Sequence, residues 1–281
     1  LPFLVLALAA LAGAVDFDET LARTVMMPLS SAAYADNPQI CISNALNGAQ
    51  VSKRVEVLCD KTSNDTCSAY TVLDRQRGFV GLVFRGTTDK YQLSIEVNTT
   101  LFEPKSDFKD GGQAALYFNT GFDVTWRAGL GDDLLRLLRE NPNFKLYITG
   151  HSLGGAMADL AAAHIIAQRM FPVDQITLYT MGMPRVGDQT YADQQDARLA
   201  SYRIVHHKDV IPHIPPKIMQ YVHHKTEIYY ENDMAPGDAY TVCDKQEDPK
   251  CSNKNQSDLN FPDHLHYYGV DITQYGKDGC Q

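Results

Sequence analysis

Residues 145–155 read KLYITGHSLGG, a strand-like run that leads into the pattern G-x-S-x-G. A helix rich in small residues is predicted directly afterwards, over residues 152–170. Between a strand and a helix, this motif forms a sharp turn that lifts the serine hydroxyl above the edge of the sheet. The glycines leave room for the turn, and the N-terminus of the helix favours an oxyanion. The motif therefore predicts an α/β fold in which Ser152 is a nucleophile.

Strands and helices alternate on both sides of this motif. We expect helices at 18–34, 132–140 and 152–170, and strands at 54–59, 69–73, 78–84, 144–149, 175–181 and 200–205. Such alternation favours a mainly parallel sheet with helices on both faces. Residues 87–110 have little periodicity and are expected to form a long loop. Because no repeat or linker interrupts the pattern, residues 15–281 are expected to form one domain.

A serine nucleophile needs a base that takes its proton and a carboxylate that orients the base. In this architecture the chain order is Ser, Asp, His. Asp209 follows the strand at 200–205, where its carboxylate would face the crevice at the strand ends. For the base, the late sequence DHLH offers His264 and His266, and the pattern alone does not separate them. Three other aspartates fit a surface helix instead: Asp188, Asp193 and Asp196.

The oxyanion hole of such a site needs two donors. One is the N–H of the residue after the nucleophile, Leu153, and the other comes from the loop after an earlier strand. Thr87 occupies that second place, just beyond the strand expected at 78–84. The two residues are therefore candidates for the oxyanion hole.

Two pairs of adjacent histidines raise the alternative of a metal-dependent hydrolase. They are His206–His207 and His223–His224. Adjacent residues on a strand point to opposite faces, so neither pair suits a single ion. We expect no metal and no cofactor, and assign these histidines a packed or solvated role.

The first 14 residues, LPFLVLALAALAGA, are apolar and end in an A-x-A pattern. The run is too short to span a bilayer, which takes about 20 apolar residues. It is typical of a secretory signal peptide that lacks its basic beginning, so the mature chain is expected to start near Val15 and to be secreted. No later segment is long and apolar enough to predict a transmembrane helix.

In an exported protein, six cysteines are expected to form disulfides. Many connectivities are compatible with the sequence, but two short spacings across polar loops suggest local pairs and leave one bridge between the chain ends. The suggested pairs are Cys59–Cys67, Cys243–Cys251 and Cys41–Cys280. Three N-x-S/T sequons suit the same compartment: Asn64, Asn98 and Asn255.

The composition excludes several classes of protein. Hydrophobic residues make up 44% and charged residues 21% of the chain, which is typical of a globular protein and not of a disordered one. The 34 acidic residues outnumber the 25 basic ones, giving a net charge of −9. This balance argues against nucleic acid as a partner and gives no electrostatic attraction to anionic membranes. We expect a monomer that acts on a lipid or ester.

Five segments together are more specific than G-x-S-x-G alone. They are FRGT at 84–87, GHSLGG at 150–155, GMPRVG at 182–187, KDVIPHIPP at 208–216 and DHLHYYG at 263–269. In these segments the sequence resembles the class 3 lipases, secreted α/β-hydrolases of the fungal triacylglycerol lipase type, over residues 73–280. The resemblance implies Ser152 as nucleophile, Asp209 as acid and His264 as base, with His266 as a neighbour. It also implies that Thr87 supplies its N–H and its hydroxyl to the oxyanion, and the suggested cysteine pairs match the family's pattern.

The resemblance also bears on the substrate. It implies that residues 88–104, TDKYQLSIEVNTTLFEP, correspond to the amphipathic helical lid of the family's lipases. Their apolar residues 91, 93, 95 and 97 alternate with a period of two, which is not helical, and the feruloyl esterases of the family have a similarly polar open loop there. We expect a triacylglycerol lipase first. The alternatives are a phospholipase A1, a feruloyl-type or general carboxylesterase, and a catalytically dead secreted binding module, which the intact triad and oxyanion positions disfavour.

Overall fold

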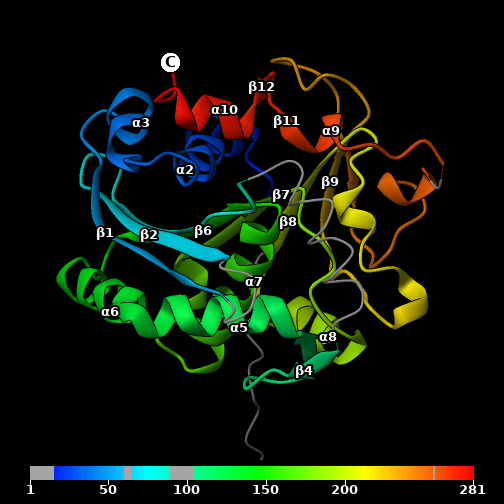
Figure 1. The fold of residues 1–281 in the computed structure, drawn as a ribbon, viewed down its shortest axis with the longest axis horizontal. Helices are drawn as coiled ribbons and strands as arrows, with labels where there is room; N and C mark the ends of the chain where they lie inside the picture. The colour runs from blue at the N-terminus through cyan, green and yellow to red at the C-terminus, as the bar shows by residue number, and fades with distance from the viewer. Residues whose placement is uncertain (1–15, 60–64, 89–103, 256) are drawn as a thin grey trace, which may run out of the picture.

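The computed structural model of the protein describes residues 16–59, 65–88, 104–255 and 257–281. Within these ranges the centre is an eight-stranded sheet of order β1-β2-β3-β6-β7-β8-β9-β10 (Figure 1). Strands β3, β6, β7, β8 and β9 are parallel, and β1, β2 and β10 add antiparallel edges. The bounds are β1 Gln50–Leu58, β2 Thr66–Asp74, β3 Phe79–Phe84, β6 Lys145–His151, β7 Ile176–Met181, β8 Ser201–His206, β9 Glu227–Tyr230 and β10 Thr241–Cys243. The prediction of a mainly parallel sheet is confirmed.

Helices cover both faces of this sheet, as Figure 1 shows. One layer consists of α5 Leu116–Thr125, α6 Gly131–Glu140, α7 Leu153–Ala167 and α8 Gln189–Arg198. The other consists of α2 Met27–Ala32, α3 Pro38–Ala45 and α10 Ile272–Lys277. The side chains of β3 pack against both helical layers. Val80 and Leu82 pack with the first layer, and Phe79 and Val83 pack with the second. The continuous apolar run of this strand is therefore explained by burial on both sides.

Helix α7 crosses under the middle of the sheet, and nearly all its side chains are buried. A helix that is apolar all round belongs in a core, and its alanines let it approach the strands closely. It begins at Leu153 and ends at Ala167, three residues before the predicted end. This helix places the residues of the G-x-S-x-G turn at the carboxyl ends of the strands.

The helix expected at 18–34 is present with an irregular centre. A short first turn, α1 Glu19–Leu21, continues through a π-helical stretch, Ala22–Met26, into α2. Asp18 caps the start, since its Oδ1 accepts from the Leu21 N–H at 2.9 Å. Pro28 cannot donate a backbone hydrogen bond, and the π-helical stretch immediately before α2 is where the helix accommodates this loss.

Two predictions about the segment after β3 need correction. Residues 105–107, expected within a loop, form β4 Lys105–Asp107, which pairs with β5 Gln113–Ala115. Helix α5 was not predicted, because its sequence LYFNTGFDVT is rich in aromatic and β-branched residues with low helix propensity. It is held by packing on α7: a Cβ on Gly121 would lie 2.9 Å from sulfur atoms of Cys67 and Met157.

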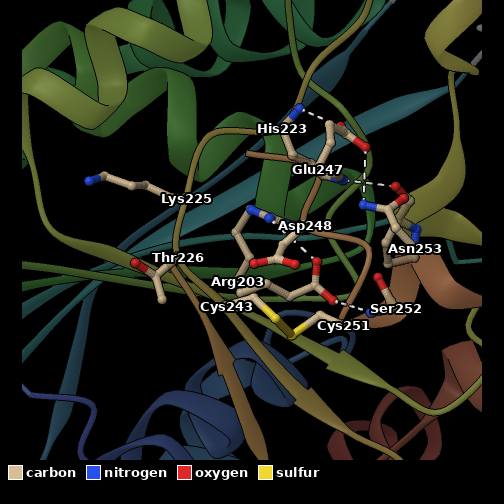
Figure 2. Close-up of polar contacts among 12 residues, drawn as sticks. Arg203, His223, Lys225, Thr226, Cys243, Glu247, Asp248, Cys251, Ser252 and Asn253 are labelled. Carbon is tan, nitrogen blue, oxygen red and sulfur yellow. Dashed lines mark hydrogen bonds and ion pairs between the residues drawn. A yellow bond between two sulfur atoms is a disulfide. The ribbon is translucent and has the colours of Figure 1, made fainter. Parts of the chain in front are cut away.

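The strands β9 and β10 were also not predicted, since polar residues dominate their surroundings in the sequence. In the structure they lie beside a polar network that includes Arg203, Glu247 and Ser252 (Figure 2). Arg203 of β8 faces Glu227 of β9 at 3.5 Å, and Glu227 also accepts from the Ser252 N–H at 2.9 Å. Nearby, Glu247 accepts from the His223 N–H at 2.8 Å and pairs with Arg185 at 2.7 Å. Charges buried in this way are stable only when they are paired, so the network fixes the edge of the sheet.

The six cysteines form three disulfides in the structure. The pairs are those that the spacing suggests: Cys41–Cys280, Cys59–Cys67 and Cys243–Cys251. The first spans 239 residues and links α3 to the end of the chain after α10. In the chain-entropy account, closing such a long loop disfavours the unfolded state by about 5–6 kcal/mol.

Several short helices and strands lie within the loops around the sheet. They are η3 Val173–Gln175, η4 Ile211–His213, η5 Lys217–Met219, η6 Ser252–Lys254, α9 Pro262–Leu265, β11 His266–Tyr267 and β12 Val270–Asp271, with η2 Trp126–Leu130 as a π-helical link between α5 and α6. Three sequence predictions lie outside the described residues: the signal segment 1–14, the sequons at Asn64 and Asn98, and all but the ends of the segment 88–104. Among the residues that are described, no helix has the length and apolar character to cross a membrane.

Candidate active site

Ser152 lies between β6 and α7, at the sharp turn that the motif predicts. Its φ of 59° and ψ of −133° lie outside the conformations that residues with a Cβ prefer, which costs of order 1–3 kcal/mol. The Ser152 N–H donates to the Met181 carbonyl at 2.9 Å and so fixes the turn to the end of β7. A Cβ on Gly150 would collide with the Gly154 backbone, and one on Gly154 with the backbone at the end of β3. The strained serine is therefore held by contacts that only glycine permits.

Asp209 and His264 meet beside this turn, although 55 residues separate them. His264 Nδ1 lies 2.9 Å from Asp209 Oδ2, and both side chains are fully buried. The same carboxylate oxygen accepts from the Tyr267 hydroxyl at 2.7 Å, and Oδ1 accepts from the Ile211 N–H at 2.8 Å. Every oxygen of the carboxylate is therefore bonded, and its orientation is fixed.

These contacts determine the charge of Asp209 and the tautomer of His264. Burial by itself would raise the pKa of Asp209. The electrostatic interaction with His264 and the hydrogen bonds from His264, Tyr267 and Ile211 lower it by more, so the pKa of Asp209 lies below its usual value. The ionised carboxylate can only accept, so His264 donates from Nδ1 and carries a lone pair on Nε2. Nε2 is buried and has no hydrogen-bond partner among the described residues. A buried acceptor without a partner costs about 1–3 kcal/mol and is typical of a functional group.

Three strand ends bring the serine and the histidine together. Gly182 follows Met181, which anchors the serine, and a Cβ on this glycine would lie 2.7 Å from Asp209 Oδ2 and 2.9 Å from His264 Nδ1. The ring of His151, next to Ser152, stacks on the ring of His264 with centroids 4.4 Å apart. The three candidate residues thus gather where β6, β7 and β8 end. In this state Ser152 is not hydrogen-bonded to Nε2, as is common before substrate binds.

Two further residues, which the sequence did not single out, support this arrangement. His151 Nε2 lies 2.8 Å from the His264 carbonyl, and its Nδ1 lies 2.7 Å from the Tyr34 hydroxyl. Because a carbonyl only accepts, Nε2 carries the proton and the tyrosine donates to Nδ1. Burial lowers the pKa of His151 to about 3, with a further lowering whenever His264 is protonated, so His151 stays neutral. His151 is the variable residue of G-x-S-x-G, and its sequence position alone gives no signal for this role.

Tyr267, also not singled out, offers a test of how Asp209 is held. We expect Tyr267→Phe to lower the free energy of unfolding at pH 7 by about 1.5–3 kcal/mol, the usual contribution of a hydrogen bond to a charged group. A depressed carboxylate pKa stabilises the fold above the pKa of the unfolded chain, and this contribution is lost as pH falls through the folded pKa. Because the pKa of Asp209 in the fold lies below that of an unfolded aspartate, the difference between variant and parent should shrink only below about pH 4, and it should vanish once the carboxylate is protonated in the fold as well.

Urea denaturation from pH 7 down to pH 2 measures this difference. Tyr268→Phe is a suitable control, because that neighbouring ring is buried and, within the described residues, makes no hydrogen bond to Asp209. A loss that stays constant over the whole pH range would mean that the Tyr267 hydroxyl acts through packing and not through the carboxylate.

Thr87 and Leu153, the oxyanion candidates, line one cavity of about 120 Å³. Thr87 comes three residues after β3, and Leu153 is the first residue of α7. Gly86 lets the two segments approach, since a Cβ there would lie 3.1 Å from Ser152 Cβ. The two oxyanion candidates therefore face one cavity, whose lining includes Leu153, the residue after Ser152.

The other candidates from the sequence lie elsewhere. His266 is exposed and its Nδ1 bonds to the Pro262 carbonyl at 2.9 Å. Asp188 caps α8, and Asp193 and Asp196 lie on that helix. Within the described part of the chain, no group of three His, Cys, Asp or Glu residues could hold a metal ion.

Asn255 is half-buried, and its Nδ2 donates to the His207 carbonyl at 3.2 Å and to the Tyr229 hydroxyl at 2.8 Å. A glycan would replace one of these two hydrogens. In the fold, glycosylation of Asn255 would therefore cost one of these two hydrogen bonds.

Comparison with known proteins identifies the family. The family model described as lipase (class 3) matches residues 81–219. A lipase of Caenorhabditis elegans is 34% identical over 94% of this chain and 83% of its own length. The chain belongs to the class 3 lipases.

Two further comparisons agree with this membership. A secreted mono- and diacylglycerol lipase of Fusarium solani is 35% identical over 53% of this chain and 46% of its own length. The solved structure of the triacylglyceride lipase of Rhizomucor miehei superposes with a TM-score of 0.79, at 23% identity, over 91% of this chain and 96% of that one. This class 3 lipase therefore has the α/β-hydrolase fold and is a serine ester hydrolase.

Proposed function

We propose that this class 3 lipase is a secreted enzyme that hydrolyses acylglycerols through Ser152, Asp209 and His264. The observation that carries the proposal is the buried His264 ring, bonded to Asp209 at Nδ1 and unpartnered at Nε2 beside the Ser152 turn. A base needs this arrangement, because the carboxylate fixes the tautomer that leaves Nε2 free to take a proton.

The reaction follows from these positions. The Ser152 oxygen attacks the ester carbonyl while His264 Nε2 takes the hydroxyl proton. The negative oxygen that forms is stabilised by the Leu153 N–H and by the N–H and hydroxyl of Thr87. Nε2 then protonates the leaving alcohol, which departs and leaves an acyl-serine. Water attacks this acyl group, His264 takes the water proton, and the fatty acid is released as Ser152 regains its proton.

Secretion is supported by three disulfides, which persist in oxidising compartments. The Fusarium solani relative is itself named as secreted. Under this proposal residues 1–14 are a signal peptide, Asn64, Asn98 and Asn255 are candidate glycosylation sites, and residues 15–281 act as one domain. The bridge between Cys41 and Cys280 supports the last point, since it joins the two ends of that stretch.

The substrate is tested by a chain-length profile. We expect higher turnover on emulsified long-chain acylglycerols than on soluble short-chain p-nitrophenyl esters. With a net charge of −9, the protein has no electrostatic attraction to anionic lipid, so its contact with substrate must be apolar. The measurement is the initial rate, in a pH-stat, against substrate concentration through the solubility limit.

The Ser152→Ala variant, measured in parallel, gives the background to subtract. A rate that falls steadily with acyl length, without a rise once emulsion forms, would replace the lipase proposal by an esterase that acts on dissolved esters.

A further inference from the structure

Asp263, the residue before His264, accepts or donates five hydrogen bonds. Its Oδ2 accepts from His207 Nδ1 at 3.0 Å, from the Lys208 N–H at 3.0 Å and from Asn260 Nδ2 at 2.9 Å. Its backbone carbonyl accepts from His206 Nδ1 at 2.9 Å, and its N–H donates to Asn260 Oδ1 at 2.8 Å. Three of these partners, at 206–208, come from the end of β8, immediately before Asp209.

The two loops that meet at Asp263 are also joined by their backbones. The Asn260 N–H donates to the Lys208 carbonyl at 2.9 Å, and the Val210 N–H donates to the Asn260 carbonyl at 3.2 Å. Together these bonds form a parallel bridge between Asp209 and Asn260. The loop that carries the proposed acid is thus bonded directly to the loop that carries the proposed base.

Helix α9, which carries His264, cannot hold this residue in place alone. It has four residues, Pro262–Leu265, and a helix of one turn is not stable without outside contacts. For α9, the end of β8 and the residues just after it supply these outside contacts. His206 is buried, while His207 has 40% of its side chain exposed and Asp263 has 19%.

The charges around Asp263 favour its ionised form. Burial by itself would raise the pKa of Asp263. The hydrogen bonds from Asn260 and Lys208 lower it by more, together with the electrostatic effect of His206 and His207, so the pKa of Asp263 lies below its usual value. A carboxylate and a carbonyl only accept, so both histidines donate from Nδ1. Further out, Lys208 Nζ lies 3.8 Å from Asp258.

We infer that Asp263 is a positioning residue, held by His206 and His207, which sets the place of the proposed base relative to the proposed acid. The inference rests on the proposed triad and assigns a role to a histidine pair that the triad does not use. The side chain of Asp263 bonds to His207 and Lys208, just after β8, and to Asn260, and none of these bonds involves Ser152 or the oxyanion candidates, so Asp263 acts through His264. Its hydrogen bonds matter more than its charge, since an amide oxygen could accept from the same three donors.

Three variants test this role: Asp263→Ala, Asp263→Asn and the control Asp258→Ala. Each is treated with a p-nitrophenyl alkylphosphonate, and kcat is expressed per titrated site, so that misfolded protein does not count. We expect Asp263→Ala to lower kcat by roughly 10- to 100-fold with KM nearly unchanged, because a displacement of about 1 Å at a catalytic group has effects of this size. Asp263→Asn should restore most of this loss. Asp258→Ala should match the parent, since Asp258 is exposed and pairs only with Lys208.

His207→Asn keeps the inference testable if Asp263→Ala does not fold. His207 has a φ of 42°, a conformation that asparagine tolerates, and the shorter side chain loses the bond to Asp263. We expect kcat per titrated site to fall roughly 3- to 10-fold with KM nearly unchanged, which corresponds to about 1 kcal/mol, while the melting temperature falls by only about 2–4 °C.

The outcomes separate the two proposals. If the phosphonate does not label Ser152 of the parent protein, as read by peptide mass, the proposed triad fails. If Ser152 is labelled but Asp263→Ala and His207→Asn keep kcat within about twofold of the parent, only the positioning role is overturned.

Discussion

Replacement of Ser152 by alanine should reduce ester hydrolysis by about 10⁴- to 10⁶-fold, to the level that the oxyanion donors alone support. The variant lacks the oxygen that attacks the ester and forms the acyl-enzyme, and no neighbouring group can take its place: His264 is a base in this geometry, and His151 has both ring nitrogens bonded. The measurement is the release of p-nitrophenol from a soluble ester, followed by active-site titration.

The fold should survive this substitution. Alanine and serine both have a Cβ, so the strain at a φ of 59° is the same in each. Ser152→Gly is the matched variant: it should be equally inactive but more stable by about 1–3 kcal/mol, because glycine adopts this conformation without strain. Hydrolysis by Ser152→Ala above about 1% of the parent rate would contradict the assignment of the nucleophile.

Asp209→Asn should have the second-largest effect, a loss of about 10⁴-fold in kcat. The amide has one donor group, whereas the carboxylate it replaces faces donors at every contact: His264 Nδ1, the Tyr267 hydroxyl and the Ile211 N–H. An amide hydrogen directed at His264 would force the ring to carry its proton on Nε2, where it cannot accept one from Ser152.

The kcat of Asp209→Asn on a soluble ester measures this effect. The matched control is Asp193→Asn, on the surface of α8, where the carboxylate bonds to Gln189 and Gln246 and lies outside the site. We expect the control to keep the parent rate. Equal rates for Asp209→Asn and Asp193→Asn would remove Asp209 from the triad and reopen the choice among the aspartates that precede His264.

Much of the fold could be predicted from local sequence. The apolar run of β3 and the small residues of α7 carry their own signals, because burial on both faces and close packing each require particular residue types. Asp18 caps its helix as its sequence position indicates. Elements without such a signal were missed: α5 has poor helix formers and depends on its contact with α7, and β9 depends on the pairing of Glu227 with Arg203.

In the candidate site, too, some residues are specified by local sequence and others only by long-range contacts. Ser152 and its glycines are specified locally, since one turn between a strand and a helix contains all the residues that it needs. The sequence pattern could not decide whether His264 or His266 is the base, because the two histidines are two residues apart in DHLH and equally polar. The structure distinguishes them by long-range contacts alone: the ring of His264 is buried against Asp209, while His266 is exposed.

By itself, then, the sequence determined the turn around Ser152, the mainly parallel sheet and the two local cysteine pairs, each of which depends on residues close in the chain or on composition. Only the tertiary structure decided the tautomer of His264, the neutral state of His151 and the bonds from His206 and His207 to Asp263. These depend on burial and on partners more than 50 residues away. Charge and hydrogen bonding in a buried site are set by three-dimensional surroundings, which no local pattern of residues encodes.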